Sequence, residues 1–121
     1  MLTVFNSLSK QKEVFKPLKP NQVSMYVCGV TVYDHCHLGH ARFMIVFDMI
    51  ANYLRHLGYA VKYVQNITDV DDKIIKKASE LHQDFTSISQ EFTMSMQDDV
   101  KSLGLGMPDV SPKATEHIHD M

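Results

Sequence analysis

The spacing of apolar residues changes its period along the middle of the chain. Val23–Val27 is a short run of β-forming residues that stops at a Cys-Gly pair, which predicts a strand. Over Ala41–Leu57 the apolar positions recur every three or four residues, the pattern of a helix with one buried stripe. That stripe comprises Phe43, Val46, Phe47, Ile50, Leu54 and Leu57. Gly58 is a natural helix stop, and Tyr59–Asn66 predicts a second strand. Strand, helix and strand in about 45 residues predict a βαβ unit with parallel strands and a right-handed crossover, and hence the α/β class.

The flanking segments carry weaker signals. Residues 2–5 predict a short edge strand, followed by a turn over residues 6–9 and a proline-flanked connector around Pro17 and Pro20. Thr68-x-x-Asp71 resembles a capping box for a helix over residues 73–81, and Ser87-x-x-Gln90 resembles one for a helix to about residue 103. Gly104 and Gly106 end that second helix. Ser111-Pro112 predicts the start of a last helix, cut at Met121. Because two or three strands and a cut helix leave at least one sheet edge unpaired, we expect the chain to be a piece of a larger domain.

Composition and charge narrow the class of protein. The 121 residues carry 12 basic and 14 acidic side chains, a formal charge of −2, which fits neither a basic nucleic-acid arm nor an acidic disordered tail. Folded alone as a compact unit, the chain would expose roughly 6,600 Å². No apolar run approaches a membrane span, and the opening residues lack the order of a signal peptide, so we expect a cytoplasmic protein with no membrane partner. Cys28 and Cys36 are then expected to be thiols.

Chemistry-bearing residues are concentrated between the first strand and the long helix. His37, Gly39 and His40 lie at the predicted helix start, where exposed N–H groups and the positive end of the helix dipole favour an anion. Two imidazoles three residues apart can donate hydrogen bonds to one triphosphate. The alternative is that both histidines cap the helix and bind no ligand. Position alone leaves both interpretations open.

Two longer motifs make a specific resemblance. Met25-Tyr-Val-Cys-Gly-Val-Thr-Val-Tyr-Asp34, followed by His37-Leu-Gly-His40-Ala-Arg42, resembles the amino-terminal signature of cysteinyl-tRNA synthetase, a class I aminoacyl-tRNA synthetase. His37-Leu-Gly-His40 is similar to that class's His-Ile-Gly-His motif, with Leu38 as a conservative departure. Tyr63-Val-Gln-Asn-Ile-Thr-Asp-Val-Asp-Asp-Lys-Ile-Ile75 also resembles the family. The resemblance covers nearly the whole chain.

This resemblance implies roles for individual residues. His37 and His40 are the implied catalytic residues, and with Gly39 they bind ATP. Cys28 is the implied ligand of a zinc ion that also binds the substrate thiolate, a soft donor that zinc prefers over a hydroxyl. Gly29 and Thr68 are implied to contact the amino acid. For Cys36 we expect packing.

Other polar groups near the motifs have simpler explanations. A magnesium site is one interpretation of the three neighbouring aspartates Asp69, Asp71 and Asp72. However, carboxylates in the first turn of a helix usually offset the helix dipole. Lys73, Lys76 and Lys77 form a small basic face that we interpret as solvated.

The implied protein is a cysteine–tRNA ligase. Residues 1–121 would be the amino-terminal part of its catalytic, nucleotide-binding domain, the first half of a Rossmann-like fold. It would convert L-cysteine and ATP, with Mg²⁺, to cysteinyl-adenylate for transfer to tRNA(Cys). The other three zinc ligands, the Lys-Met-Ser-Lys-Ser loop, the second half of the fold and the anticodon-binding region would lie beyond Met121. We therefore expect the 121 residues alone to be inactive.

Three other functions stay open from the sequence. A related ligase could transfer the activated cysteine to an aminosugar. The short chain could itself be a nucleotide-binding or subunit-interacting module without catalysis. It could also be a small zinc domain that uses Cys28, Cys36 and the histidines, although their spacing is irregular for such a site.

Overall fold

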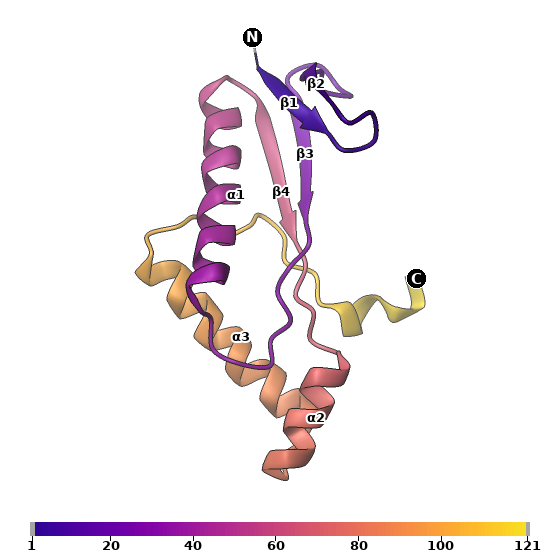
Figure 1. The fold of residues 1–121 in the computed structure, drawn as a ribbon, viewed down its shortest axis with the longest axis vertical. Coiled ribbons are helices and arrows are strands. Elements are labelled where there is room, and N and C mark those ends of the chain that lie inside the picture. Colours follow the sequence, from indigo (N-terminus) through magenta and orange to yellow (C-terminus); the bar gives the residue numbers. More distant parts are fainter. Residues whose placement is uncertain (1, 121) are drawn as a thin grey trace.

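The computed structural model describes residues 2–120, in which a helix lies against one face of a parallel strand pair (Figure 1). Strand β3 (Gln22–Val27) pairs in parallel with β4 (Ala60–Gln65), in register from Gln22 opposite Ala60 to Val27 opposite Gln65. Helix α1 (Leu38–His56) connects them. The two predicted strands, the helix between them and the parallel pairing are confirmed.

The buried stripe of α1 is displaced from the predicted one. Met44, Ala51 and Leu54 are its buried residues, and Ala51 packs with Val27 and Tyr63 of the strands. Val46 and Leu57, which the periodicity assigns to the stripe, are exposed. The small side chain of Ala51 lets the helix approach the sheet closely. The prediction missed this position because it counted only large apolar residues.

A hairpin absent from the sequence prediction precedes the parallel strands. The predicted edge strand is present as β1 (Thr3–Asn6), but it pairs antiparallel with β2 (Gln11–Val14), in the segment interpreted as turn and connector. Its turn contains Lys10 at φ 57°, a left-handed position without glycine.

Two helices follow β4 and pack on each other. These are α2 (Asp72–Leu81) and α3 (Phe85–Ser102), with Ile74, Ala78, Ile88 and Phe92 in a shared core. Both predicted N-caps are wrong. Asp71 rather than Thr68 caps α2 through the backbone N–H of Lys73, and Asp84 rather than Ser87 caps α3 through that of Thr86. The short aspartate side chains lie directly before each first turn and accept those N–H groups.

The last segment runs beside β4 before a short 3₁₀ helix (Ala114–Asp120). Isolated parallel bridges join Val64 to Val110 and Ile67 to Lys113, and Asp109 accepts the backbone N–H of Tyr63 at 2.6 Å. The predicted α-helix starting at Ser111-Pro112 is therefore wrong, because these residues pair with the sheet edge. The predicted end of that helix at Met121 lies outside the described residues.

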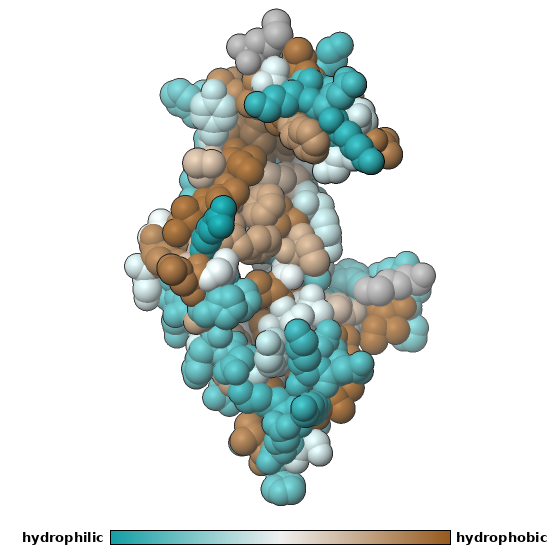
Figure 2. Space-filling model, viewed as in Figure 1, coloured by the Kyte–Doolittle hydropathy of each residue, from teal (hydrophilic) through white to brown (hydrophobic). Residues whose placement is uncertain are grey.

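The chain is more open than a compact monomer. Its accessible surface is 8626 Å², against about 6,600 Å² expected for its mass. Apolar side chains gather along α1 in Figure 2. Ile45, Met49 and Tyr53 of this helix are exposed. No helix within residues 2–120 combines the length and apolarity that crossing a membrane requires.

Candidate functional site

Two histidines, His37 and His40, cap the start of α1 through hydrogen bonds between their side chains and the backbone of the first turn. His37 is the N-cap, and its Nδ1 accepts the backbone N–H of Gly39 at 3.0 Å. In return, Nδ1 of His40 accepts the backbone N–H of His37 at 3.2 Å. The two rings lie 4.0 Å apart between centroids, tilted by 33°. The predicted helix-start histidines therefore form one compact pair.

This reciprocal capping determines which ring nitrogen carries the proton. A neutral imidazole has one donor nitrogen and one acceptor nitrogen. Since Nδ1 accepts in both rings, the proton of each must be on Nε2. Each ring then has an Nε2–H that the helix cap does not use. The pair can offer two donors to an anion at the positive end of α1, whose first turn holds no acidic residue.

The surroundings of His40 favour its neutral form. Partial burial lowers the pKa of His40 below its ordinary 6.5, and the neighbouring His37 lowers it further. Protonation would place a hydrogen on Nδ1, which could then no longer accept the backbone N–H of His37. The cap and the neutral state therefore support each other.

Gly39 gives the rings room. A Cβ on Gly39 would lie 2.8 Å from Cε1 and 3.0 Å from Nδ1 of His37, closer than ordinary contact. The glycine between the two histidines thus allows the His37 ring to fold back over the first turn.

A second network joins the carboxyl ends of β3 and β4. The backbone N–H of Gly29 donates to Oδ1 of Asn66 at 2.6 Å, and Nδ2 of Asn66 donates to the hydroxyl of Thr68 at 3.2 Å. A Cβ on Gly29 would lie 1.6 Å from the backbone oxygen of Asn66, so only glycine fits. The structure thus brings Gly29 and Thr68 together through Asn66. Sequence reasoning missed Asn66, although it lies within the quoted Asn-Ile-Thr-Asp motif, because nothing local indicates its partner 37 residues away.

Cys28 lies at the end of β3 as an exposed free cysteine. Its only polar contact among the described residues is with the carbonyl of Gly29 at 3.7 Å. The thiol is thus accessible to a metal as a single soft donor. However, residues 2–120 contain no group of three or more His, Cys, Asp or Glu side chains that could hold a metal ion. The described residues do not form a zinc site by themselves.

The remaining polar residues have structural roles. Asp69 is buried and accepts the backbone N–H of Thr115 at 3.0 Å and its hydroxyl at 2.6 Å. Asp71 caps α2, and Asp72 lies in its first turn. Cys36 is half-buried, and its pKa is raised by burial and by the carboxylate of Asp99. Asp71 and Asp72 thus lie at the start of α2, where their charge offsets the helix dipole, whereas Asp69 lies before the helix and is bonded to Thr115 instead.

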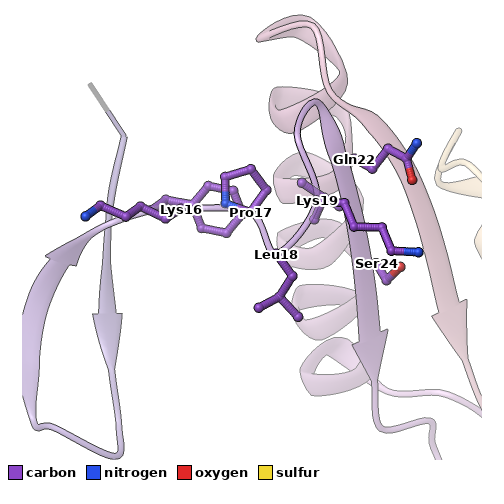
Figure 3. A pocket seen from close by; sticks show the side chains of 8 residues that line it. Lys16, Pro17, Leu18, Lys19, Gln22 and Ser24 are labelled. Atoms are coloured by element: carbon purple, nitrogen blue, oxygen red, sulfur yellow. The ribbon is translucent and has the colours of Figure 1, made fainter.

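The two networks remain separate within residues 2–120. No hydrogen bond among residues 2–120 joins Cys28, Gly29 or Thr68 to the histidine pair. The cleft beside His37 contains none of those three residues. His37 lines a cleft of about 340 Å³ between the start of α1 and the end of α3. A pocket of about 250 Å³ lies at the other end of the sheet, between the connector and β3 (Figure 3), and holds none of the predicted site residues.

Comparison with known proteins identifies a consistent set of relatives. The chain matches the family described as tRNA synthetases class I (C) catalytic domain over residues 14–121. It is 54% identical over all 121 residues to the cysteine–tRNA ligase of Alkalilimnicola ehrlichii and 55% identical to that of Methylococcus capsulatus, covering 26% of each. It is 58% identical over 120 residues, 99% of the chain, to the cysteine–tRNA ligase of Geobacter metallireducens, covering 25% of that protein. The chain therefore spans about a quarter of the length of these relatives.

Proposed function

The chain belongs to the cysteine–tRNA ligase family of class I aminoacyl-tRNA synthetases, and from this premise we propose that it carries the part of the enzyme that activates L-cysteine with ATP. In that reaction the carboxylate of cysteine attacks the α-phosphate, cysteinyl-adenylate forms and pyrophosphate leaves. Residues 1–121 would be the first part of the nucleotide-binding domain. The parallel pairing of β3 and β4 around α1 supports the first half of a Rossmann-like fold.

The observation that carries the proposal is the reciprocal cap of His37 and His40. It leaves two Nε2–H donors at the positive end of a 19-residue helix, in a first turn free of carboxylates. Such fixed donors stabilise charge that develops on phosphate oxygens without having to reorient during the reaction. We assign His37 and His40 as the catalytic residues and, with Gly39, as the ATP-binding ones.

The Gly29–Asn66–Thr68 network supports an amino-acid site at the strand ends. In parallel α/β sheets, ligands bind outside the carboxyl ends of the strands, where this network lies. Gly29 lets the two backbones approach within contact, and the amide of Asn66 fixes the hydroxyl of Thr68. We assign Gly29 and Thr68 to the binding of L-cysteine.

Cys28 would supply one ligand of a zinc ion, which when bound would select a thiolate substrate. Its exposed thiol at the end of β3 supports that role. The remaining ligands must come from outside the described residues, because residues 2–120 form no metal cluster. No step of the proposed activation depends on the zinc.

The whole protein would transfer the activated cysteine to tRNA(Cys) in the cytoplasm, with Mg²⁺ accompanying ATP. This chain would need the other three quarters of a ligase as its partner. The 121 residues alone would lack the rest of the phosphate and zinc sites.

The test is cysteine-dependent exchange of pyrophosphate into ATP by the intact ligase carrying these residues. We expect His40→Ala to reduce exchange by about 10² to 10³. His56→Ala, an exposed histidine at the other end of the same helix, is the matched control and should leave exchange unchanged. Undiminished exchange by the His40 variant would overturn the assignment.

A further inference from the structure

The four residues before the histidine cap each contact a helix that follows in the sequence. This segment, Tyr33–Cys36, connects buried Val32 to the N-cap His37. The ring of Tyr33 faces Nζ of Lys73 at 5.2 Å, and Asp34 lies 3.3 Å from Nζ of Lys77. Nδ1 of His35 lies 3.0 Å from Oγ of Ser95, and Cys36 and Asp99 line the same cleft. The whole segment is therefore attached to α2 and α3.

The spacing of the partners shows that two helix faces make these contacts. Lys73 and Lys77 lie four residues apart on α2, and Ser95 and Asp99 lie four residues apart on α3. Residues four apart lie one above the other on the same face of a helix. Each helix thus presents a single row of side chains to the segment.

Lys77 is the central contact of this arrangement. Its ammonium pairs with Asp34 and also lies 5.0 Å from the ring of Phe92. The rings of His35 and Phe92 pack edge to face, with their centroids 5.2 Å apart and an angle of 82° between their planes. Phe92 is buried in the core shared by α2 and α3, so Lys77 and His35 are both held against a rigid group. The side chain of Lys77 is 27% exposed, whereas that of Lys76 is 80% exposed and pairs with Glu80 of its own helix.

We infer that α2 and α3 position the His37–His40 pair through the segment Tyr33–Cys36, and that Lys77 is a positioning residue for ATP. The inference rests on the proposed function of the histidine pair. Because Cys36 directly precedes the N-cap, a shift of the segment moves the ring of His37 and hence both Nε2–H donors. The Gly29–Asn66–Thr68 network lies at the strand ends, and its link to this region is the backbone hydrogen bond from Val32, before the segment, to the carbonyl of Thr68. We therefore expect the network to move less than the histidine pair when the segment shifts.

The experiment measures pyrophosphate exchange by the intact ligase while ATP and cysteine are varied separately. We expect Lys77→Met to lower kcat/KM for ATP by about tenfold, because small displacements of catalytic groups are costly. The KM for cysteine should not change. Lys77→Arg, which can keep both the ion pair and the ring contact, should restore exchange. Lys76→Met is the matched control and should resemble the wild type.

A second variant covers the other helix. Ser95→Ala removes the partner of His35 without disturbing the core and should also weaken ATP utilisation selectively. If Lys77→Met and Ser95→Ala behave like Lys76→Met, or raise the KM for cysteine as much as that for ATP, the inference is wrong. That outcome is distinct from failure of the proposed function, in which the His40 variant itself would retain exchange.

Discussion

Gly29→Ala is the perturbation whose cost the structure specifies most closely. The new Cβ would lie 1.6 Å from the backbone oxygen of Asn66 and 2.7 Å from its carbonyl carbon. Since Cβ contacts below 3.0 Å essentially never occur, the ends of β3 and β4 would have to separate by about 1.4 Å. Neither atom belongs to a flexible side chain that could move aside.

Such a separation removes specific interactions. The 2.6 Å bond from Gly29 to Asn66 would be lost, and the bridge between Thr31 and Thr68 beside it would be strained. Overpacking costs about 1–3 kcal/mol and a lost hydrogen bond about 1 kcal/mol, so we expect a destabilisation of about 2–4 kcal/mol. Displacement of Thr68 should also raise the KM for cysteine more than that for ATP.

Urea unfolding of the chain and exchange kinetics of the intact ligase measure these two effects. Gly106→Ala is the matched control, because its Cβ would meet only the carboxylate end of Asp48 at 3.0 Å, and we expect a cost below about 1 kcal/mol. If Gly29→Ala matched this control in stability and left the KM for cysteine unchanged, the close approach of the strand ends would not matter as argued.

Two further predictions concern buried and titrating groups. The pKa of His40 lies below 6.5 in the folded chain, so the unfolded chain binds more protons at pH values between the folded pKa and 6.5. The contribution of His40 to stability is therefore present above pH 6.5 and is lost as the pH falls through the folded pKa. Thermal unfolding followed by circular dichroism should show that the loss of stability on acidification is smaller in His40→Asn than in the wild type. Equal losses in the two proteins would contradict the argument. Asp69→Ala should lower the free energy of unfolding by about 2 kcal/mol, because it removes both hydrogen bonds to Thr115 and leaves that residue's partly buried N–H without its acceptor. Asp98→Ala, which removes an exposed carboxylate, is the control. If the two variants lowered the free energy of unfolding equally little, the hydrogen bonds of Asp69 would contribute nothing.

Local sequence patterns predicted the centre of the fold. The β-forming runs and the helical spacing between them specify β3, α1 and β4, and Gly58, at φ 90°, follows the predicted helix end. The histidines could be placed at the helix start for the same reason, since a cap is a local feature. Their reciprocal bonding could not be predicted, because it depends on ring orientation.

The failures lie where distant partners decide the structure. Thr68 has a capping side chain, but its carbonyl accepts the N–H of Val32 and its hydroxyl bonds to Asn66, which holds it beside the strand end. The hairpin of β1 and β2 is largely exposed and mostly polar in its second strand, so hydrophobic patterning gives no signal for it. The contacts of Asp34 with Lys77 and of Gly29 with Asn66 span about forty residues and have no sequence signature.

The most direct test of the central claim is pyrophosphate exchange by His40→Asn in the intact ligase. The asparagine oxygen can replace Nδ1 as acceptor of the His37 backbone N–H, but the amide does not extend to the position of Nε2. The claim predicts that the helix content is retained while exchange falls about as far as in His40→Ala. Exchange at the wild-type rate with asparagine at this position would mean that the histidine only caps the helix and donates nothing to ATP.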